Sequence, residues 1–218
     1  MRQFQILSVL FFSALGLSCT PPEQNTLTQF VSAVQAGNET AASQVSLVDS
    51  PAEFTTWEIG EIGPESSEPF PLMELLERKA AADEELKAMI KKNDAYIQEN
   101  EALYIKYKPQ KDKDPDTEFE GELKAFDETF SARMDEQKEL IRKISQTDRE
   151  IDELKKAAAL STSTPGISSG YDGDVKAKQA RLKLDDTDYT VTLKQYALVH
   201  TEHQIEPMAR WIITDIQK

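Results

Sequence analysis

Charged residues dominate the middle of the chain, and apolar residues return there at intervals of three and four. The interval alternates strictly between Phe119 and Ala158, over more than five heptads. The same rhythm runs from Leu72 to Tyr107, with a larger share of polar positions. Heptads sustained over this length predict helices that pair as a coiled coil.

A short polar segment from Lys108 to Asp116 separates the two heptad series and contains Pro109 and Pro115. Because proline lacks the amide donor that a helix needs, neither helix should continue through this segment. So short a break favours pairing within the chain, as an antiparallel helical hairpin over residues 70–159. At ~1.5 Å per residue, each arm would extend roughly 55 Å.

A turn centred in that segment also predicts which residues face each other across the hairpin. Ile97 would face Phe130, and Asn93 would face Arg133, so that polar residues share a layer. Matched polar layers fix the register of paired helices at some cost in stability.

The segments on both sides of the hairpin have a different pattern. Four apolar residues at helical spacing before Gly37 predict a short helix. These residues are Leu27, Phe30, Val31 and Val34. Runs of β-branched and aromatic residues predict strands at 54–62, 175–184, 189–199 and 209–216. A segment rich in Ser, Thr, Gly and Pro predicts a flexible loop at 160–170.

The two flanks are too small to be separate domains, so residues 26–69 and 171–218 should form one α+β domain. It would be a short helix on a four-stranded antiparallel sheet, with the coiled-coil hairpin inserted after the first strand. In the strand at 189–199, period-two alternation places Tyr196 on the polar face. The segment Trp211–Ile213 is apolar on both faces and predicts a central strand.

The N-terminal segment combines a positive charge at Arg2 with an apolar run from Phe4 to Leu17. The run is too short to span a bilayer as a permanent helix, so residues 1–18 are predicted to be a cleaved secretion signal. The segment ends in Leu15-Gly16-Leu17-Ser18-Cys19, which resembles the processing box of bacterial lipoproteins. The alternative is an ordinary cleaved signal that leaves Cys19 unmodified.

The lipoprotein resemblance implies that Cys19 is acylated and becomes the mature N-terminus, with residues 19–25 as a polar tether. Several acyl chains, at ~0.8 kcal/mol per buried methylene, would hold the protein on a membrane. Thr20 stands where Asp would resemble an inner-membrane retention signal. The expected location is therefore the cell envelope, on the outer membrane facing the periplasm.

The formal net charge of −14 argues against nucleic acid as a partner, because such binding needs a basic stripe. So acidic a body should also be repelled by anionic lipid and stand away from the membrane surface. A single Cys excludes an internal disulfide, and with only two His it leaves little for a metal cage. We therefore expect no metal or other cofactor.

Catalytic motifs are missing from the sequence. No Gly-x-Ser-x-Gly, His-Glu-x-x-His or phosphate-binding glycine loop occurs, so the chain is not expected to be an enzyme. His200 and His203 lie three positions apart in a predicted turn, where an exposed polar turn is favoured over a metal site. Aspartates alternate over residues 112–116, but the Gly and Glu of a calcium loop are missing.

The flanks resemble small lipoproteins of the nuclear transport factor 2-like (cystatin-like) superfamily. The resemblance is carried by Leu27–Asn38, Trp57-Glu58-Ile59, Tyr189–Leu193 and Arg210-Trp211-Ile212-Ile213. Such domains open with a helix that ends at Gly and an acidic or amide residue, and close with a strand carrying Trp-hydrophobic-Ile. The resemblance covers about half the chain and implies a curved sheet wrapped on helices, a scaffold with many functions.

Three hypotheses for function follow. The first is a non-catalytic, lipid-anchored envelope protein that presents the hairpin to another protein. Its expected contact residues are Tyr104, Tyr107, Pro109, Pro115 and Phe119. The second is a ligand-binding module with a pocket in the curved sheet. The expected pocket residues are Trp57, Tyr189, Tyr196 and Arg210. The third is a periplasmic adaptor or a chaperone-like protein.

Overall fold

The computed structural model describes residues 20–218 and confirms the α+β class. The helices within this range are α1 (Pro22–Gln35), α2 (Glu39–Ser43), α3 (Leu72–Glu99), α4 (Glu101–Lys113) and α5 (Gly121–Thr162). The strands are β1 (Trp57–Ile62), β2 (Ser66–Pro69), β3 (Tyr171–Leu184), β4 (Thr187–His200) and β5 (Ile212–Gln217). All five strands form one antiparallel sheet of order β1-β3-β4-β5, in which β2 also pairs with β3.

The long β3–β4 hairpin forms the centre of this sheet, and the other strands pair with it. Its register is unbroken from Tyr171 opposite His200 to Leu184 opposite Thr187. The two-residue turn contains Asp185, whose positive φ of 49° suits a tight hairpin turn. Thr56 and Thr55 donate backbone N–H bonds to the Asp185 carboxylate at 2.8 and 3.0 Å, and the Thr55 hydroxyl adds another at 2.9 Å. These bonds hold the pKa of Asp185 below its ordinary value and fasten the chain before β1 to the turn.

The sheet carries a separate hydrophobic core on each face. Because β3 and β4 pair without a bulge, odd and even residues of β4 point to opposite faces. Val191 and Leu193 are buried on one face, whereas Tyr196 and Leu198 are buried on the other. The prediction that Tyr196 lies on the polar face is therefore wrong, because a different element covers that face near this end of the strand.

The first core lies under α1, which covers one face of the sheet. Its buried members from α1 are Leu27, Phe30 and Val31, and its main partners from the sheet are Leu182, Leu184, Tyr189, Val191, Leu193 and Ile213. The predicted helix before Gly37 is confirmed, and it begins earlier than expected, at Pro22. Residues 22–25 are thus helical and not part of a tether, since proline is well suited to the first turn of a helix.

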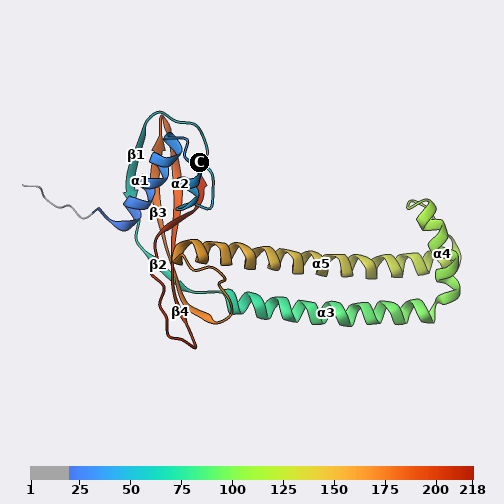
Figure 1. The fold of residues 1–218 in the computed structure, drawn as a ribbon. Helices are drawn as coiled ribbons and strands as arrows, with labels where there is room; N and C mark the ends of the chain where they lie inside the picture. The colour runs from blue at the N-terminus through green and yellow to red at the C-terminus, as the bar shows by residue number, and fades with distance from the viewer. Residues whose placement is uncertain (1–19) are drawn as a thin grey trace, which may run out of the picture.

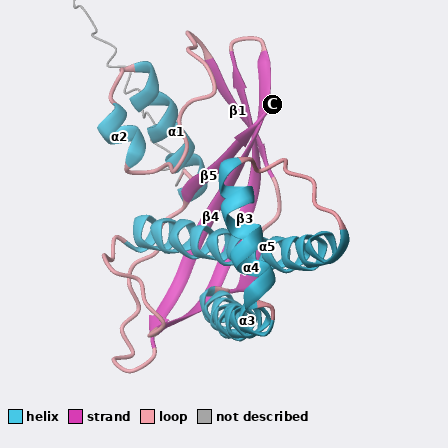
Figure 2. Cartoon of the chain, turned by 90° about the vertical axis from the view of Figure 1, so that its right-hand side faces the viewer, coloured by secondary structure: helices cyan, strands magenta, loops and turns pink. Residues whose placement is uncertain are grey.

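The second core lies on the opposite face, under the ends of α3 and α5 that are nearest the sheet. We call these ends the hairpin roots. Its buried members from the roots and their flanks are Phe70, Leu72, Ile151, Ala157, Ala158 and Ile167. Its members from the sheet are Val175, Tyr196, Leu198 and Ile212. From this core α3 and α5 leave the sheet side by side, and Figure 1 shows them extending far beyond it. Figure 2, turned by 90° from Figure 1, shows α5 crossing in front of the strands.

A buried serine connects α5 to the sheet at the same place. Ser161 donates through Oγ to the Arg210 carbonyl at 2.6 Å, and the same atom accepts the Tyr196 N–H at 3.0 Å. The Ser161 carbonyl accepts the Arg210 N–H at 2.9 Å. The C-terminal end of α5 is therefore part of the sheet domain, and the predicted flexible loop at 160–170 is wrong for residues 160–162.

Strand β5 lies at the edge of the sheet, so the prediction of a central strand at Trp211–Ile213 is wrong. The strand is nevertheless covered on both faces, because Ile213 belongs to the first core and Ile212 to the second. Its outer edge is also occupied, since Leu47 donates its N–H to the Ile213 carbonyl and Ile213 donates to the Val45 carbonyl. Apolarity on both faces here reflects two covering elements and not a central position.

Helices α3 and α5 run antiparallel, with one buried stripe between them. The Lys79 Nζ atom lies 3.5 Å from Asp148 Oδ1. Further along the pair, Asn93 Nδ2 donates to Gln137 Oε1 at 2.8 Å. The predicted pairing of Asn93 with Arg133 is wrong by one helical turn. The Arg133 guanidinium instead lies 4.6 Å from the centre of the Tyr96 ring, in a cation–π contact.

The hairpin root is predicted to be indispensable and the outer hairpin dispensable for folding of the sheet. Replacing residues 84–143 with a short Gly-rich turn keeps every member of the second core and the Lys79–Asp148 pair. We expect this shortened chain to unfold cooperatively, with a Tm near that of the full chain, because closure entropy varies slowly with length. Thermal unfolding followed by circular dichroism measures it.

The matched control replaces residues 70–170, the whole segment that the sequence pattern marks as an insertion. It removes Phe70, Leu72, Ile151 and Ile167 from the second core. At ~1.5–3 kcal/mol each, these side chains contribute about 6–12 kcal/mol, which is comparable to the ~5–15 kcal/mol stability of a whole domain. This control should not fold cooperatively. Equal behaviour of the two chains would contradict the assignment of the root to the core.

Candidate functional site

The far end of the helical pair is bent by a separate helix, α4. Helix α3 ends at Glu99 and is capped by Asn100, whose side chain donates to the Tyr96 carbonyl at 2.9 Å. Helix α4 begins at the next residue, Glu101. Figure 1 shows α4 lying across the ends of α3 and α5. The predicted straight arm to Tyr107 is thus wrong, and α4 continues through Pro109 to Lys113 where a break was expected.

A cluster of six aromatic residues explains why α4 folds back. We call it the tip cluster: Tyr96, Tyr104, Tyr107, Phe119, Phe126 and Phe130. The Phe126 ring stacks on Tyr96 and on Phe130, with centroids 5.6 and 5.5 Å apart. Tyr107 from α4 meets the edge of the Phe126 ring at 5.3 Å. Such pairs contribute ~0.5–1.5 kcal/mol each beyond their buried area, enough to hold a short helix against the pair.

Lys111 ties the chain that follows α4 to this cluster. Its ammonium donates to the carbonyls of Pro115 and Thr117 at 3.1 and 3.0 Å. It also lies 3.4 Å from an Asp127 carboxylate oxygen and 5.3 Å from the centre of the Phe119 ring. One cation therefore fixes the turn between α4 and α5 in place.

The outer face of α4 carries an exposed apolar stripe, which we call the tip surface. It consists of Ala102, Ile105 and Pro109, all exposed and spaced so that they share one side of a helix. Ile105 is 62% exposed. Beside the stripe, Lys108 and Asp112 form an ion pair at 3.0 Å. A compact apolar stripe with charges beside it suits contact with another protein.

The predicted contact residues divide between the inside and the outside of the tip. Tyr107 and Phe119 are buried and Tyr104 is half-buried in the tip cluster, so the cluster uses them internally. Pro109 and Pro115 are exposed, and Pro109 belongs to the tip surface. Sequence analysis missed Ile105 because its position outside the heptad seam carries no signal until the bend at Asn100 is known.

The predicted pocket residues do not line one cavity. Trp57 and Tyr189 belong to the first core, Tyr196 belongs to the second, and Arg210 is exposed with its Nε donating to the Leu160 carbonyl at 3.1 Å. Burial raises the pKa of Tyr196 to about 12, so its hydroxyl stays protonated at neutral pH. The sheet therefore offers no pocket made of these four side chains.

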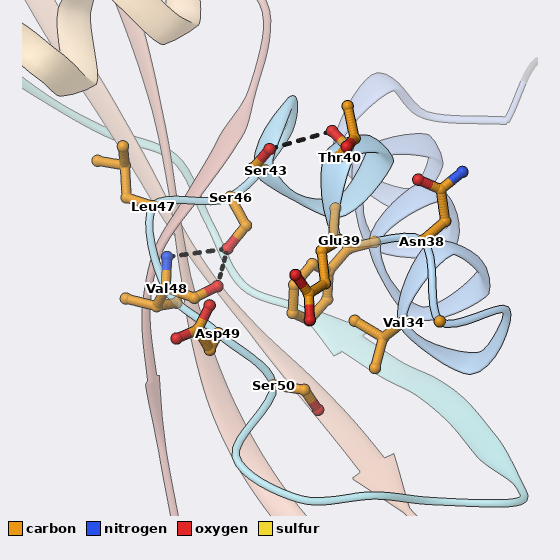
Figure 3. A pocket seen from close by; sticks show the side chains of 13 residues that line it. Val34, Asn38, Glu39, Thr40, Ser43, Ser46, Leu47, Val48, Asp49 and Ser50 are labelled. Carbon is orange, nitrogen blue, oxygen red and sulfur yellow. Dashed lines mark hydrogen bonds between the residues drawn. The ribbon is translucent and has the colours of Figure 1, made fainter.

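A cavity of about 740 Å³ lies beside α2 and the chain that follows it (Figure 3). Three of its polar side chains bond to the backbone of nearby residues. Ser46 Oγ donates to the Val48 carbonyl at 2.6 Å, and Ser43 donates to the Thr40 carbonyl at 3.0 Å. Asn38 accepts the Ala41 N–H at 3.0 Å as the cap of α2. Glu39 and Asp49 also line the cavity, and both are exposed to solvent.

The two histidines lie together in the turn after β4. Their rings stack with centroids 4.6 Å apart, and His203 donates its N–H to His200 Nδ1 at 3.3 Å. Over residues 20–218, no group of three or more His, Cys, Asp or Glu side chains is arranged to hold a metal ion. We assign no chemical role to this turn.

Cys19 and the predicted signal peptide lie outside the described residues. Within residues 20–218, none of the helices has the length and apolarity needed to cross a membrane. The chain matches no family model, no curated protein and no solved structure. The resemblance to nuclear transport factor 2-like lipoproteins therefore stays a prediction from its residues.

Removing Phe126 is predicted to free α4 without unfolding the sheet. Phe126→Ala takes away the ring that contacts Tyr96, Tyr104, Tyr107 and Phe130. Loss of a buried Phe costs ~3–5 kcal/mol, and here the whole loss falls on the tip cluster. Backbone amides of 101–113 should exchange with deuterium much faster, while those of β3 and β4 keep their protection.

Ile105→Ala serves as the control, because Ile105 is exposed on the same helix and contributes little to the cluster. It should leave exchange in both regions unchanged. Equal acceleration in the sheet and in α4 after Phe126→Ala would contradict a tip that is stabilised on its own.

Proposed function

We propose that this protein is a non-catalytic, lipid-anchored protein of the cell envelope that presents a coiled-coil hairpin for contact with another protein. One observation above all supports the proposal. The tip surface stands at the end of a long helical pair and is held by an aromatic core of its own, far from the sheet (Figure 1). A separate core at the tip adds nothing to the stability of the sheet. It is explained if the tip itself contacts another protein.

The packing of the helical pair indicates that its role is to hold the tip at a distance from the sheet. Only the roots of α3 and α5 contribute to the second core. Beyond the roots, the two helices bury a single stripe against each other, and the outer faces are charged. At ~1.5 Å per residue, the 42 residues of α5 extend roughly 63 Å. Most of this length adds nothing to the sheet domain and serves to carry the tip outward.

The anchor rests on the N-terminal sequence. The apolar run before Cys19 resembles a lipoprotein signal, and Cys19 is the single cysteine of the chain. Multiple acyl chains on one residue would give stable attachment, whereas one chain binds reversibly. A membrane anchor and a long arm are consistent with a protein that bridges a membrane surface and a partner at a distance from it.

Crosslinking from the tip tests the contact. A photoreactive amino acid placed at Ile105 in living cells should give a discrete product of higher mass, because Ile105 is the most prominent apolar side chain of the tip surface. The matched control is Thr190, which is exposed on β4. Crosslinked products from Thr190 and none from Ile105 would show that the partner contacts the sheet. That result would overturn the assignment of the contact to the tip.

Substitution of Cys19 tests the anchor. We expect Cys19→Ser to leave the chain unprocessed at this site or to release it from the membrane fraction, since no thiol remains to be acylated. Mass spectrometry of the mature wild-type protein should find an acylated N-terminal peptide that begins at Cys19. An unmodified N-terminus at another position would contradict the lipid anchor.

A further inference from the structure

The start of α1 lies close to the loop between β4 and β5. Thr26 Oγ1 on α1 donates to the Trp211 carbonyl at 3.2 Å. Gln195 Nε2 donates to the Ala209 carbonyl at 3.0 Å, on the face of β4 that α1 covers. Met208 is three residue steps from Trp211, which limits the distance between their Cα atoms to about 11 Å. The C-terminal part of the 201–210 loop therefore lies near the start of α1, whereas Ile205 lies at the end of β4, beside His200.

This loop exposes two large apolar side chains. Met208 is 91% exposed and Ile205 is 59% exposed. The loop is held in place, because His200 donates its N–H to the Ile205 carbonyl at 2.9 Å and Gln204 donates to the His200 carbonyl at 2.8 Å. An apolar side chain as exposed as that of Met208, close to the anchored end of the chain, suits a site that meets an apolar phase.

Charged side chains near the start of α1 are paired. Lys178 donates to Glu23 at 2.7 Å and lies 5.1 Å from the centre of the Trp211 ring. Burial opposes ionisation of Glu23, but the hydrogen bond from Lys178, a backbone hydrogen bond and the Lys178 charge together outweigh it and lower the pKa of the carboxyl. Lys176 pairs with Glu65 at 3.3 Å. These pairs reduce the local repulsion that the acidic body as a whole would feel from a lipid surface.

The position of Cys19 limits how far the domain can stand from its anchor. Only Thr20 and Pro21 separate Cys19 from the first residue of α1. Three residue steps extend about 11 Å at most. The sequence-based expectation that the acidic body stands away from the membrane is therefore at odds with the early start of α1.

We propose that residues 206–210 and the N-terminal turn of α1 form a lipid-facing surface, with Met208 inserted among the lipids of the bilayer that holds Cys19. This inference rests on the proposed lipid anchor. It also fixes the direction of the helical pair relative to the bilayer. Because α1 and the hairpin roots cover opposite faces of the sheet, α3 and α5 then project away from that bilayer (Figure 1). The tip surface meets its partner well clear of the lipid.

The test uses the full lipidated protein in phosphatidylcholine vesicles whose acyl chains carry bromine, a quencher of fluorescence. Met208→Cys adds one free thiol for a fluorescent label, since the native cysteine is acylated. Ile105→Cys at the tip and Thr190→Cys on the opposite face of β4 are matched exposed controls. On vesicles, the label at Met208 should lose more than half of its fluorescence, and the labels at Ile105 and Thr190 should keep theirs.

The outcomes separate this inference from the proposed function. Protein that floats with the vesicles but shows equal fluorescence at all three labels would overturn the lipid-facing surface and leave the anchor intact. Protein that does not float with the vesicles would overturn the lipid anchor, and this inference with it. Quenching at Ile105 in place of Met208 would show that the arm points towards the lipid, the opposite of the inferred orientation.

Discussion

The change of buried face along β4 is the constraint on which the rest of the structure depends. The β3–β4 ladder has no bulge, so alternation is strict along both strands. Buried side chains nevertheless change from odd positions at Leu193 to even positions at Tyr196. Each face is thus apolar over only part of its length. One helix cannot satisfy such a sheet, and α1 and the hairpin roots must pack on opposite faces.

The helical pair beyond the roots faces a different difficulty, because two helices alone bury only one stripe. The structure compensates at two points. Buried Asn93 and half-buried Gln137 form a hydrogen bond in the seam, which favours one register. The tip cluster then closes the far end, where fraying would otherwise start. Tyr107 and Phe119, far apart from any other core, are buried there because α4 turns back over α5.

Periodicity predicted the parts of the fold in which one face is buried against one partner. Helix α1, both long helical segments and most of the strands follow from it. The misses have physical causes. Strand β2 is fully exposed and carries no alternation, so its pairing with β3 leaves no trace in the pattern. Pro109 lies inside α4, whereas the bend is at Asn100, because the aromatic contacts outweigh the bond that proline removes. The tip surface depends on that bend and could not be predicted without it.

The direction of the arm follows from the same phase change that produces two cores. If the buried residues of β4 stayed in phase, α1 and the hairpin would compete for one face, and the arm would leave the sheet beside the start of α1. An arm on that side would lie along any membrane to which the short N-terminal segment is attached. With the roots on the opposite face, the sheet lies between α1 and the helical pair. The link from α1 through Leu193 and Tyr196 to α5 is packed core throughout, so the position of α1 determines where the tip points.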